Sequence, residues 1–523
     1  MTRHLRVAFL SLTWPLAAIA QERVDVLVRG GRVVDGTGAP ARPADVGIRG
    51  DRIVFVGDAA AGGVTGARVI DAQGMVVAPG FIDPHTHTYG DLQSDRADRR
   101  RNAAYLMQGV TTVVTGNDGG GPADVAEHFA RYAKNGIGTN AALFVGFGTV
   151  RGKVLGPSSA PADAAQLARM RDLVADGMRG GALGLSTGLY YAPQSYATTE
   201  EVIEMAKVAS AAGGIYDSHL RDESSYTIGV VGAVREAIRI GREARLPVHI
   251  AHLKALGVDV WGRSDSIVAV IEAARAAGQA ITADQYPYTA SGSGVGASLL
   301  PRWAEAGGRD SLRRRSQDPA TRERLLADMR ENLRRRNGPQ SLLITDGGRR
   351  DLVGKTLEAI AKARGVEPVI AALDIVLTGD ASVASFNMNE ADIERLMRQP
   401  FVFTGSDGSD GHPRKYGTYP KKLREYVLGK HVLSLETFVA RSSRDVAAAL
   451  GIPERGMLAV GQFADLVVFA PEAVRERSTY EAPTELATGM SYVLVNGTVA
   501  VDGGRLTDAL AGRGIIRRDR APR

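Results

Sequence analysis

Two histidines separated by one residue, His85 and His87, follow an apolar run and are the first residues with an evident chemical use. Alternate side chains of a β-strand point to the same side, so both imidazoles can face one point. Imidazole is a common zinc ligand, and two of them would supply half of a tetrahedral site. A surface strand can carry the same pair without binding anything, so further ligands must come from other parts of the chain.

Polar residues that could complete such a site follow other strand-like runs. They are Asp118, His219, His252, Lys254 and Asp407. The chain has no cysteine, so a metal would have to be bound by histidine and carboxylate. Asp118 stands beside glycines and can also be read as a turn residue. His249 has the opposite parity to His252, which predicts that it packs against the outer helices.

Strand-like runs alternate with segments of helical periodicity, such as residues 200–212 and 266–277. The strand-like runs are residues 76–82, 110–115, 141–145, 181–185, 215–217, 248–252, 280–283 and 401–404. The first of them is broken by Pro79-Gly80 and resumes at Phe81. This pattern predicts an α/β protein with a closed (β/α)8 TIM-type barrel. Active sites of such barrels lie at the carboxyl ends of the strands, so the candidate ligands are expected to converge there.

Both ends of the chain differ from this middle part, because they consist of short strands with glycine and asparagine turn signals. We expect one small β-sandwich domain built from residues 21–75 and 456–523, with the barrel at residues 76–455. The stretch between Tyr288 and Phe401 is too long for one βα unit. It predicts a helical insertion near the active site at about residues 290–345, containing the Arg-rich segment 301–337.

The N-terminus has the organisation of a removable signal peptide over residues 1–20. Arg3, His4 and Arg6 precede an apolar stretch, and Ala18-Ile19-Ala20 forms a small-x-small cleavage site. The apolar stretch is too short for a permanent membrane span, and no later segment of that length is free of charges. We therefore expect an exported, periplasmic protein without a membrane span.

The net charge of +6 is small for 523 residues. The densest basic clusters, residues 313–315 and 334–336, lie in a polar segment of helical character with almost no aromatic residues. Nucleic-acid binding requires a basic surface interleaved with aromatic side chains, or a known module. We interpret these clusters as a solvated helical face and expect no nucleic-acid partner.

Several strings of the sequence, taken in their order, resemble the D-aminoacylase branch of the amidohydrolase superfamily. They are GFIDPHTH, GVTTVVTGN, GLSTGLYYAP, DSHLRDE, IAHLKALG, DQYPYTA, GSDG and HPRKYGTYP. The resemblance runs from about Val24 to Arg517, and the GLSTGLYY and HPRKYGTYP strings are its most specific parts. It implies a barrel, a small β-domain made from both termini and an inserted segment near the site.

The resemblance also implies roles for individual residues. The metal ligands would be His85, His87, His219, His252 and Asp407, and the substrate-binding residues would be Tyr191, Lys254, Tyr288 and Arg414. One departure matters, because the family commonly has a cysteine ligand in a GNCG string where this chain has GNDG. The strand-four lysine of other superfamily branches is missing too, so Asp118 becomes the candidate for a bridging or third ligand.

The activity that the resemblance implies is metal-dependent hydrolysis of N-acyl-D-amino acids, or of dipeptides with a C-terminal D-residue. One or two zinc ions, or cobalt or manganese, would polarise the scissile carbonyl and activate a water molecule. Asp407 would act as general base and then acid, and Arg414 with Lys254 would bind the free carboxylate of a small-molecule substrate. Two alternatives stay open: hydrolysis of another carboxylate-bearing or cyclic amide, and a metal-poor binding protein without catalysis.

Overall fold

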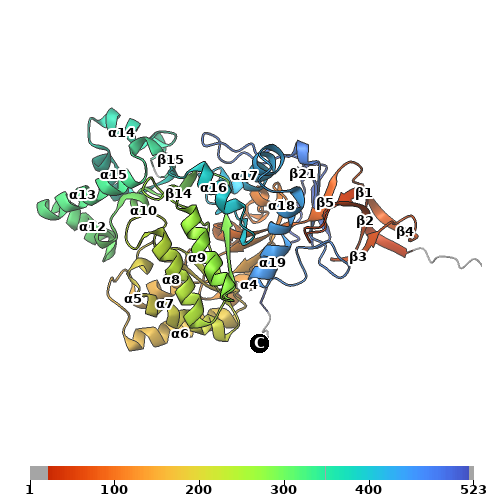
Figure 1. Cartoon of the computed structure of the whole chain (residues 1–523), viewed down its shortest axis with the longest axis horizontal. Helices are drawn as coiled ribbons and strands as arrows, with labels where there is room; N and C mark the ends of the chain where they lie inside the picture. The colour runs from red at the N-terminus through yellow and green to blue at the C-terminus, as the bar shows by residue number, and fades with distance from the viewer. Residues whose placement is uncertain (1–21, 348, 518–523) are drawn as a thin grey trace, which may run out of the picture.

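The structure is a computed structural model that describes residues 22–347 and 349–517 (Figure 1). The signal peptide expected at residues 1–20 lies outside the described residues. Three parts follow one another along the long axis of the molecule (Figure 1): a small β-domain, a central barrel and an inserted unit. Within the described residues, no helix is both long enough and apolar enough to cross a membrane.

The central part is the expected (β/α)8 barrel, with parallel strands that neighbour one another in chain order. Its strands are β6 (Phe81–Thr86), β7 (Val110–Thr115), β8 (Asn140–Leu143) continued by β9 (Val145–Gly146), β10 (Gly184–Gly188), β11 (Ile215–His219), β12 (Val248–Ile250), β13 (Ile281–Gln285) and β17 (Val402–Thr404). The chain after β17 closes the ring onto β6, because Asp407 N donates to His85 O at 2.9 Å and His87 N donates to Gly408 O at 3.0 Å.

Amphipathic helices cover the outside of the barrel (Figure 1). They include α4 (Val125–Asn135), α6 (Ala164–Arg179), α7 (Thr199–Ala211), α8 (Gly229–Ala244), α9 (Ser264–Ala276) and α16 (Glu390–Met397). In α8 the buried positions Val230, Val234, Ala237 and Gly241 recur every three or four residues, which places one apolar stripe against the strands. The sequence periodicity therefore identified the outer layer correctly.

The first barrel strand begins later than predicted. Residues 76–82 do not form one strand, because β5 (Val76–Pro79) pairs with strands of the small domain and only β6 enters the barrel. Gly80 separates the two, and a Cβ on it would lie 2.2 Å from the Thr111 hydroxyl. The break at Pro79-Gly80 is confirmed, but counting the whole run as the first barrel strand was wrong. Both halves are apolar and fully buried, so hydrophobicity alone cannot show that they join different sheets.

The small β-domain combines strands from both ends of the chain in one sheet. Its strands are β1 (Glu22–Val33), β2 (Arg42–Arg49), β3 (Arg52–Gly57), β4 (Val64–Asp71), β5, β18 (Leu466–Phe469), β19 (Met490–Val495), β20 (Thr498–Asp502) and β21 (Arg505–Leu506). β1 pairs in parallel with β4 over its first half and with β5 near its end. Their buried side chains, such as Val28, Val46 and Leu466, form a core of their own.

The unit inserted between β13 and β17 is larger than the helical segment expected at about residues 290–345. Its antiparallel sheet has the order β14 (Ala290–Gly294), β16 (Ala381–Phe386), β15 (Leu342–Gly347). Helices α10 (Val295–Leu299), α12 (Gly308–Gln317), α13 (Pro319–Arg335), α14 (Leu357–Arg364) and α15 (Pro368–Thr378) surround it. Side chains such as Leu325, Met329, Ile344 and Ile375 form a separate core, so the unit is a small α/β layer beside the barrel mouth.

Candidate metal centre and active site

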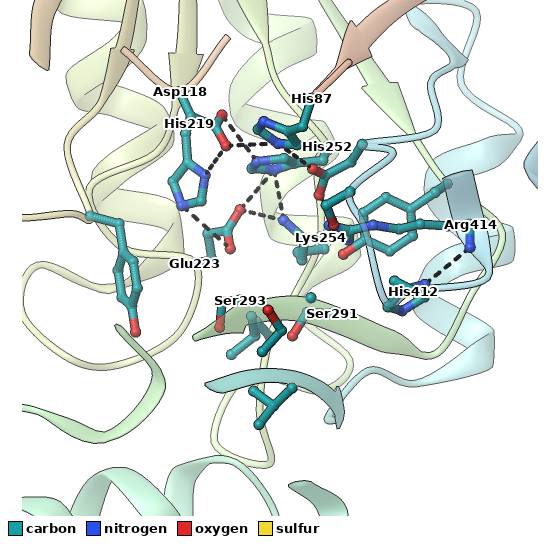
Figure 2. A pocket seen from close by; sticks show the side chains of 18 of the residues that line it. His87, Asp118, His219, Glu223, His252, Lys254, Ser291, Ser293, His412 and Arg414 are labelled. Carbon is teal, nitrogen blue, oxygen red and sulfur yellow. Dashed lines mark hydrogen bonds and ion pairs between the residues drawn. The ribbon is translucent and has the colours of Figure 1, made fainter. Parts of the chain in front are cut away.

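The candidate ligands converge at the carboxyl ends of the barrel strands, as the barrel prediction required (Figure 2). His85 lies in β6 and His87 directly after it, while His219 is the last residue of β11. Asp118, His252 and Asp407 stand in the short loops that follow β7, β12 and β17. Parallel strands of a closed barrel end at one rim, which brings together side chains that are more than 300 residues apart in sequence.

The carboxylate of Asp118 lies between four histidines, and Figure 2 shows three of them, His87, His219 and His252, around it. Its Oδ1 is 3.4 Å from His85 Nε2 and 3.5 Å from His252 Nε2, and its Oδ2 is 3.5 Å from both His87 Nε2 and His219 Nδ1. The backbone of Asp118 is left-handed, with φ 57°, a conformation that aspartate tolerates better than most residues. The position is thus a turn, but its carboxylate faces the histidines.

Charge distribution around Asp118 favours the ionised carboxylate. Burial would raise the pKa of Asp118, but the neighbouring His85 and His219 outweigh this effect and hold that pKa well below its usual value. An ionised carboxylate with imidazoles on both oxygens is suited to contact more than one cation. Asp118 therefore occupies the position that a bridging ligand would need.

The unsatisfied polar atoms of this cluster fit a metal-binding role. Both ring nitrogens of His85 and of His219, and Oδ1 of Asp118, are buried and have no hydrogen-bond partner in the part of the chain that the structure describes. Two sets of ligand atoms lie within 4.8 Å of one another: His85, Asp118, His252 and Asp407, and His219, Glu223 and His252. Buried polar atoms are costly unless paired, and nitrogen with carboxylate oxygen suits zinc, cobalt or manganese. The residues present therefore fit one or two divalent ions.

Asp407 connects the histidines to an arginine. Its Oδ1 lies 3.0 Å from His87 Nε2 and 3.6 Å from His85 Nε2, and its Oδ2 lies 2.8 Å from Arg414 Nη1. Burial would raise the pKa of Asp407, but Arg414, followed by His252, more than compensates, so that pKa is held well below its usual value. Arg414 begins α17 (Arg414–Lys421), and its guanidinium lies 4.7 Å from the ring centroid of Tyr286.

Glu223, a carboxylate that the sequence analysis did not single out, lies beside the candidate ligands. Its Oε1 accepts from Lys254 Nζ at 2.5 Å and lies 3.0 Å from His252 Nδ1, while its Oε2 is 3.9 Å from His219 Nε2 (Figure 2). Burial opposes ionisation of Glu223, but Lys254 and the two histidines lower its pKa. The only available signal was its place in the DSHLRDE string, because it stands on a loop where no strand parity applies.

A cavity of about 310 Å³ opens beside the metal ligands, bounded by the inserted unit on its other side. Tyr191, Lys254 and Arg414 line it as expected. Tyr288 does not, because it borders a separate cavity with Lys421 and Glu476. Tyr286 lines the active-site cavity instead. Bends at Pro287 and Thr289 turn the chain after β13, so the two tyrosines diverge.

His249 does not pack against the outer helices, so that prediction was wrong. Its Nε2 lies 2.9 Å from Asp284 Oδ2, its Nδ1 lies 2.9 Å from Thr282 Oγ1, and its ring stacks on Phe403 of β17, the strand on the other side of β13. The Asp284 carboxylate also accepts from the backbone N–H of His252 at 3.1 Å. The parity argument failed because β12 ends at Ile250, and His252 has a left-handed backbone with φ 34°.

Arg336 also departs from its expected place on a solvated face. It follows the end of α13, is only 2% exposed and lines the active-site cavity. Arg334, two residues earlier, is about half exposed and pairs with Asp259 and Glu331, as expected of a solvated cluster. Helical periodicity predicts which side chains within a helix are exposed. It does not predict the direction of the side chain that follows the last helical residue.

Comparison with known proteins agrees with this architecture. A family model described as the amidohydrolase family matches residues 68–501. A D-aminoacylase from Alcaligenes xylosoxydans xylosoxydans is 35% identical over 520 residues, covering 94% of this chain and 98% of that protein. The crystal structure of a D-aminoacylase superimposes with a TM-score of 0.80 at 36% identity, covering 94% of this chain and 99% of that one.

A second similar structure was solved with a metal ion and an inhibitor bound. It is the N-acyl-D-glutamate deacylase from Bordetella bronchiseptica, complexed with zinc and a phosphonate inhibitor that mimics the tetrahedral intermediate. This structure is 30% identical, has a TM-score of 0.80 and covers 95% of this chain and 100% of that one. With a family model that spans most of its length and a near full-length relative above 30% identity, the chain belongs to the amidohydrolase family.

Proposed function

We propose that this protein is a metal-dependent deacylase that hydrolyses N-acyl-D-amino acids, with zinc as its preferred ion. The observation that carries the proposal is the cluster of four histidines around Asp118, with Asp407 beside it, facing a cavity that also contains Arg414 and Lys254. A metal centre next to cationic side chains suits an amide substrate with a free carboxylate. The similarity to D-aminoacylase and N-acyl-D-glutamate deacylase supports this substrate class.

His85, Asp118, His219, His252 and Asp407 would hold the ion or ions, with Glu223 as a further candidate. His87 would join them, because its Nε2 lies 3.5 Å from Asp118 Oδ2 and 3.0 Å from Asp407 Oδ1. A bound divalent ion supplies Lewis-acid chemistry, which polarises a carbonyl and makes a water molecule more acidic. Asp407 accepts the proton of the attacking water, and its low pKa keeps it ionised for that step. It then donates the proton to the departing amide nitrogen, which leaves as the amine of the D-amino acid.

The cationic side chains of the cavity bind the substrate carboxylate. The planar guanidinium of Arg414 suits bidentate capture of the α-carboxylate, and Lys254 adds a second positive charge. The backbone N–H of Arg414 donates to His412 Nδ1 at 3.1 Å, and the opposite nitrogen of that ring lies 3.2 Å from Ala290 O, which positions the start of α17. Burial raises the pKa of Tyr191 well above its usual value, so its hydroxyl stays available as a neutral donor.

The decisive experiment combines metal analysis with a substrate panel. Purified protein is expected to contain zinc, and release of amine from N-acetyl-D-amino acids is expected to require zinc, cobalt or manganese. The matching N-acetyl-L-amino acids and cyclic amides, such as hydantoins, serve as comparison substrates. Hydrolysis of cyclic amides without turnover of any N-acyl-D-amino acid would replace the proposal by the other amidohydrolase reaction, and protein without metal or turnover would refute it.

We also propose that the protein is exported and acts in the periplasm. The support is the charged, apolar and small-x-small succession over residues 1–20. D-Amino acids occur in peptidoglycan fragments, so export would bring the enzyme close to such compounds. N-terminal sequencing of protein recovered from a periplasmic fraction is expected to begin at Gln21, whereas protein that retains Met1 in the cytoplasmic fraction would contradict export.

A further inference from the structure

The active-site cavity contains three cationic side chains, and only Arg336 has no carboxylate partner among the described residues. Lys254 Nζ contacts Glu223 Oε1 at 2.5 Å, and Arg414 Nη1 lies 2.8 Å from Asp407 Oδ2. Arg336 is 2% exposed, and in residues 22–347 and 349–517 it makes no ion pair. A buried charge that lacks a counter-ion is costly unless a ligand supplies one.

The contacts that hold Arg336 in place are all with neutral groups. Its Nε donates to Ser298 O at 3.1 Å and its Nη2 donates to the Tyr190 hydroxyl at 3.2 Å. In the amide orientation of Asn387 that satisfies its neighbours, the Asn387 oxygen accepts from Arg336 Nη1 at 3.2 Å. The Tyr226 ring, whose centroid lies 5.9 Å from the guanidinium carbon, is neutral as well. These partners fix the guanidinium at the cavity wall, but none of them supplies a negative charge.

The cavity wall contributed by the inserted unit is polar. Ser291 and Ser293 of β14, Thr345 of β15 and Ser382 of β16 line it, and Figure 2 shows Ser291 and Ser293 on the strand that faces the metal centre. Leu256 and Val383 are the aliphatic side chains among the described lining residues. An apolar substrate side chain would offer the guanidinium no counter-charge, and a site built around a buried polar group rejects substrates that lack its partner strongly.

We propose that Arg336 recognises a second carboxylate of the substrate, so that the preferred substrates are N-acyl derivatives of acidic D-amino acids, glutamate or aspartate. This inference rests on the proposed deacylase function. Lys254 and Arg414 are proposed to bind the α-carboxylate, and the inserted unit presents Arg336 with its serine and threonine hydroxyls to the side chain. Arg336 is thereby a specificity-determining residue, supplied by a segment outside the barrel.

The test compares charged and neutral substrates of nearly the same shape. With zinc-loaded full-length enzyme, kcat/KM for N-acetyl-D-glutamate is expected to exceed that for N-acetyl-D-glutamine by about tenfold or more, as for a charge-assisted pair. N-Acetyl-D-aspartate and N-acetyl-D-asparagine form a second matched pair, and N-acetyl-D-leucine reports on apolar side chains. This comparison uses the unaltered enzyme and needs no variant to fold.

Variants then assign the preference to Arg336. Arg336→Met is expected to reduce kcat/KM for the acidic substrate about tenfold more than for its neutral partner, and Arg336→Lys is expected to retain part of the preference. Arg334→Met is the matched control, because Arg334 lies in the last turn of α13, two residues before Arg336, but pairs with Asp259 outside the cavity. A purely structural role of Arg336 would lower turnover of both substrates equally and leave their ratio unchanged.

The outcomes separate this inference from the function on which it rests. Turnover of neutral N-acyl-D-amino acids that equals or exceeds that of the acidic ones would overturn the role of Arg336 and leave the deacylase proposal intact. An acid preference that survives in Arg336→Met would also overturn it. Absence of turnover with every N-acyl-D-amino acid, despite bound zinc, would instead remove the deacylase proposal.

Discussion

The guanidinium of Arg414 lies 2.8 Å from Asp407 Oδ2, while the other oxygen of the same carboxylate lies 3.0 Å from His87 Nε2. Asp407 therefore stands between the histidines that we propose bind the metal and the arginine that we propose binds the substrate carboxylate. The pairing keeps Asp407 ionised, and it places the proposed carboxylate-binding residue next to the proposed acid–base group. Both residues are buried, so the interaction is only weakly screened by salt.

Removal of Arg414 is expected to shift the pH dependence of catalysis. Arg414 lowers the pKa of Asp407, so Arg414→Met should raise that pKa, and the ionised base should be lost at a higher pH as the solution is acidified. The acidic limb of the kcat/KM profile should therefore move to higher pH, with an increase in KM for substrates that carry a free carboxylate. An acidic limb that stays in place would show that Arg414 does not control the ionisation of Asp407.

Asp407→Asn is expected to lower kcat by about two to four orders of magnitude, because an amide cannot accept and return the proton. The remaining ligands should keep most of the metal, so metal content and kcat are measured on the same preparation. Asp410→Asn is the control: Asp410 borders the same cavity, but its side chain is 63% exposed and paired with Lys415, away from the histidines. Near wild-type turnover in Asp407→Asn would exclude Asp407 as the acid–base group.

Asp118→Asn is expected to lose metal and activity together. Asparagine tolerates the left-handed backbone of this position, so the substitution removes the charge without adding backbone strain. Asp118→Cys should recover zinc binding and become less tolerant of manganese, because a thiolate is a softer ligand than a carboxylate. If elemental analysis finds a full metal content in Asp118→Asn, with only a lower melting temperature, then Asp118 is a turn residue and not a ligand.

The two tyrosines after β13 provide a matched pair for substrate binding. Tyr286 lines the active-site cavity, and its buried hydroxyl has no hydrogen-bond partner among the described residues. Tyr286→Phe is expected to raise KM several-fold, in the range of one neutral hydrogen bond of about 1 kcal/mol. Tyr288→Phe removes a hydroxyl from a separate cavity and should leave KM near the wild-type value. If Tyr288→Phe raises KM and Tyr286→Phe does not, then Tyr288, and not Tyr286, contacts the substrate.

A buried lysine outside the active site should make stability depend on pH. Lys422 is fully buried, its Nζ has no hydrogen-bond partner in the described part of the chain, and burial, with Arg441 nearby, lowers its pKa to about 7. Between that pH and the unperturbed lysine pKa of about 10.4, the unfolded chain binds more protons than the folded one, so this residue makes stability rise with pH. Its destabilising effect is complete below about pH 7 and disappears at strongly alkaline pH.

Lys422→Met should therefore raise the free energy of unfolding by roughly 2–4 kcal/mol near pH 6.5, because each unit of pKa shift corresponds to about 1.4 kcal/mol. The gain should shrink as the pH approaches about 10.4. Urea unfolding of the variant and the wild type at both pH values measures it. Lys421→Met is the control, because Lys421 forms an ion pair with Glu425 at 2.5 Å. Equal gains at the two pH values would show that packing, and not charge, is responsible.

Local patterns predicted the barrel and most of the candidate ligands. Strand periodicity is a property of neighbouring residues, so His85 and His87 could be assigned to one side of a strand from their spacing alone. The alternation of strands and helices then predicted a common rim for His219, His252 and Asp407. The substitution of Asp118 for the family's cysteine was also visible in the sequence, as was the resemblance that suggested Arg414.

Other features depended on contacts between distant segments, and only the tertiary structure decided them. Glu223 joins the metal centre because its loop folds toward Lys254, and Tyr286 replaces Tyr288 because the chain bends after β13. Arg336 lies 82 residues after Lys254 in the sequence, yet it borders the same cavity because the inserted unit packs over the barrel mouth. Loops and inserted units have no fixed period, so their side-chain directions are set by packing against the rest of the fold.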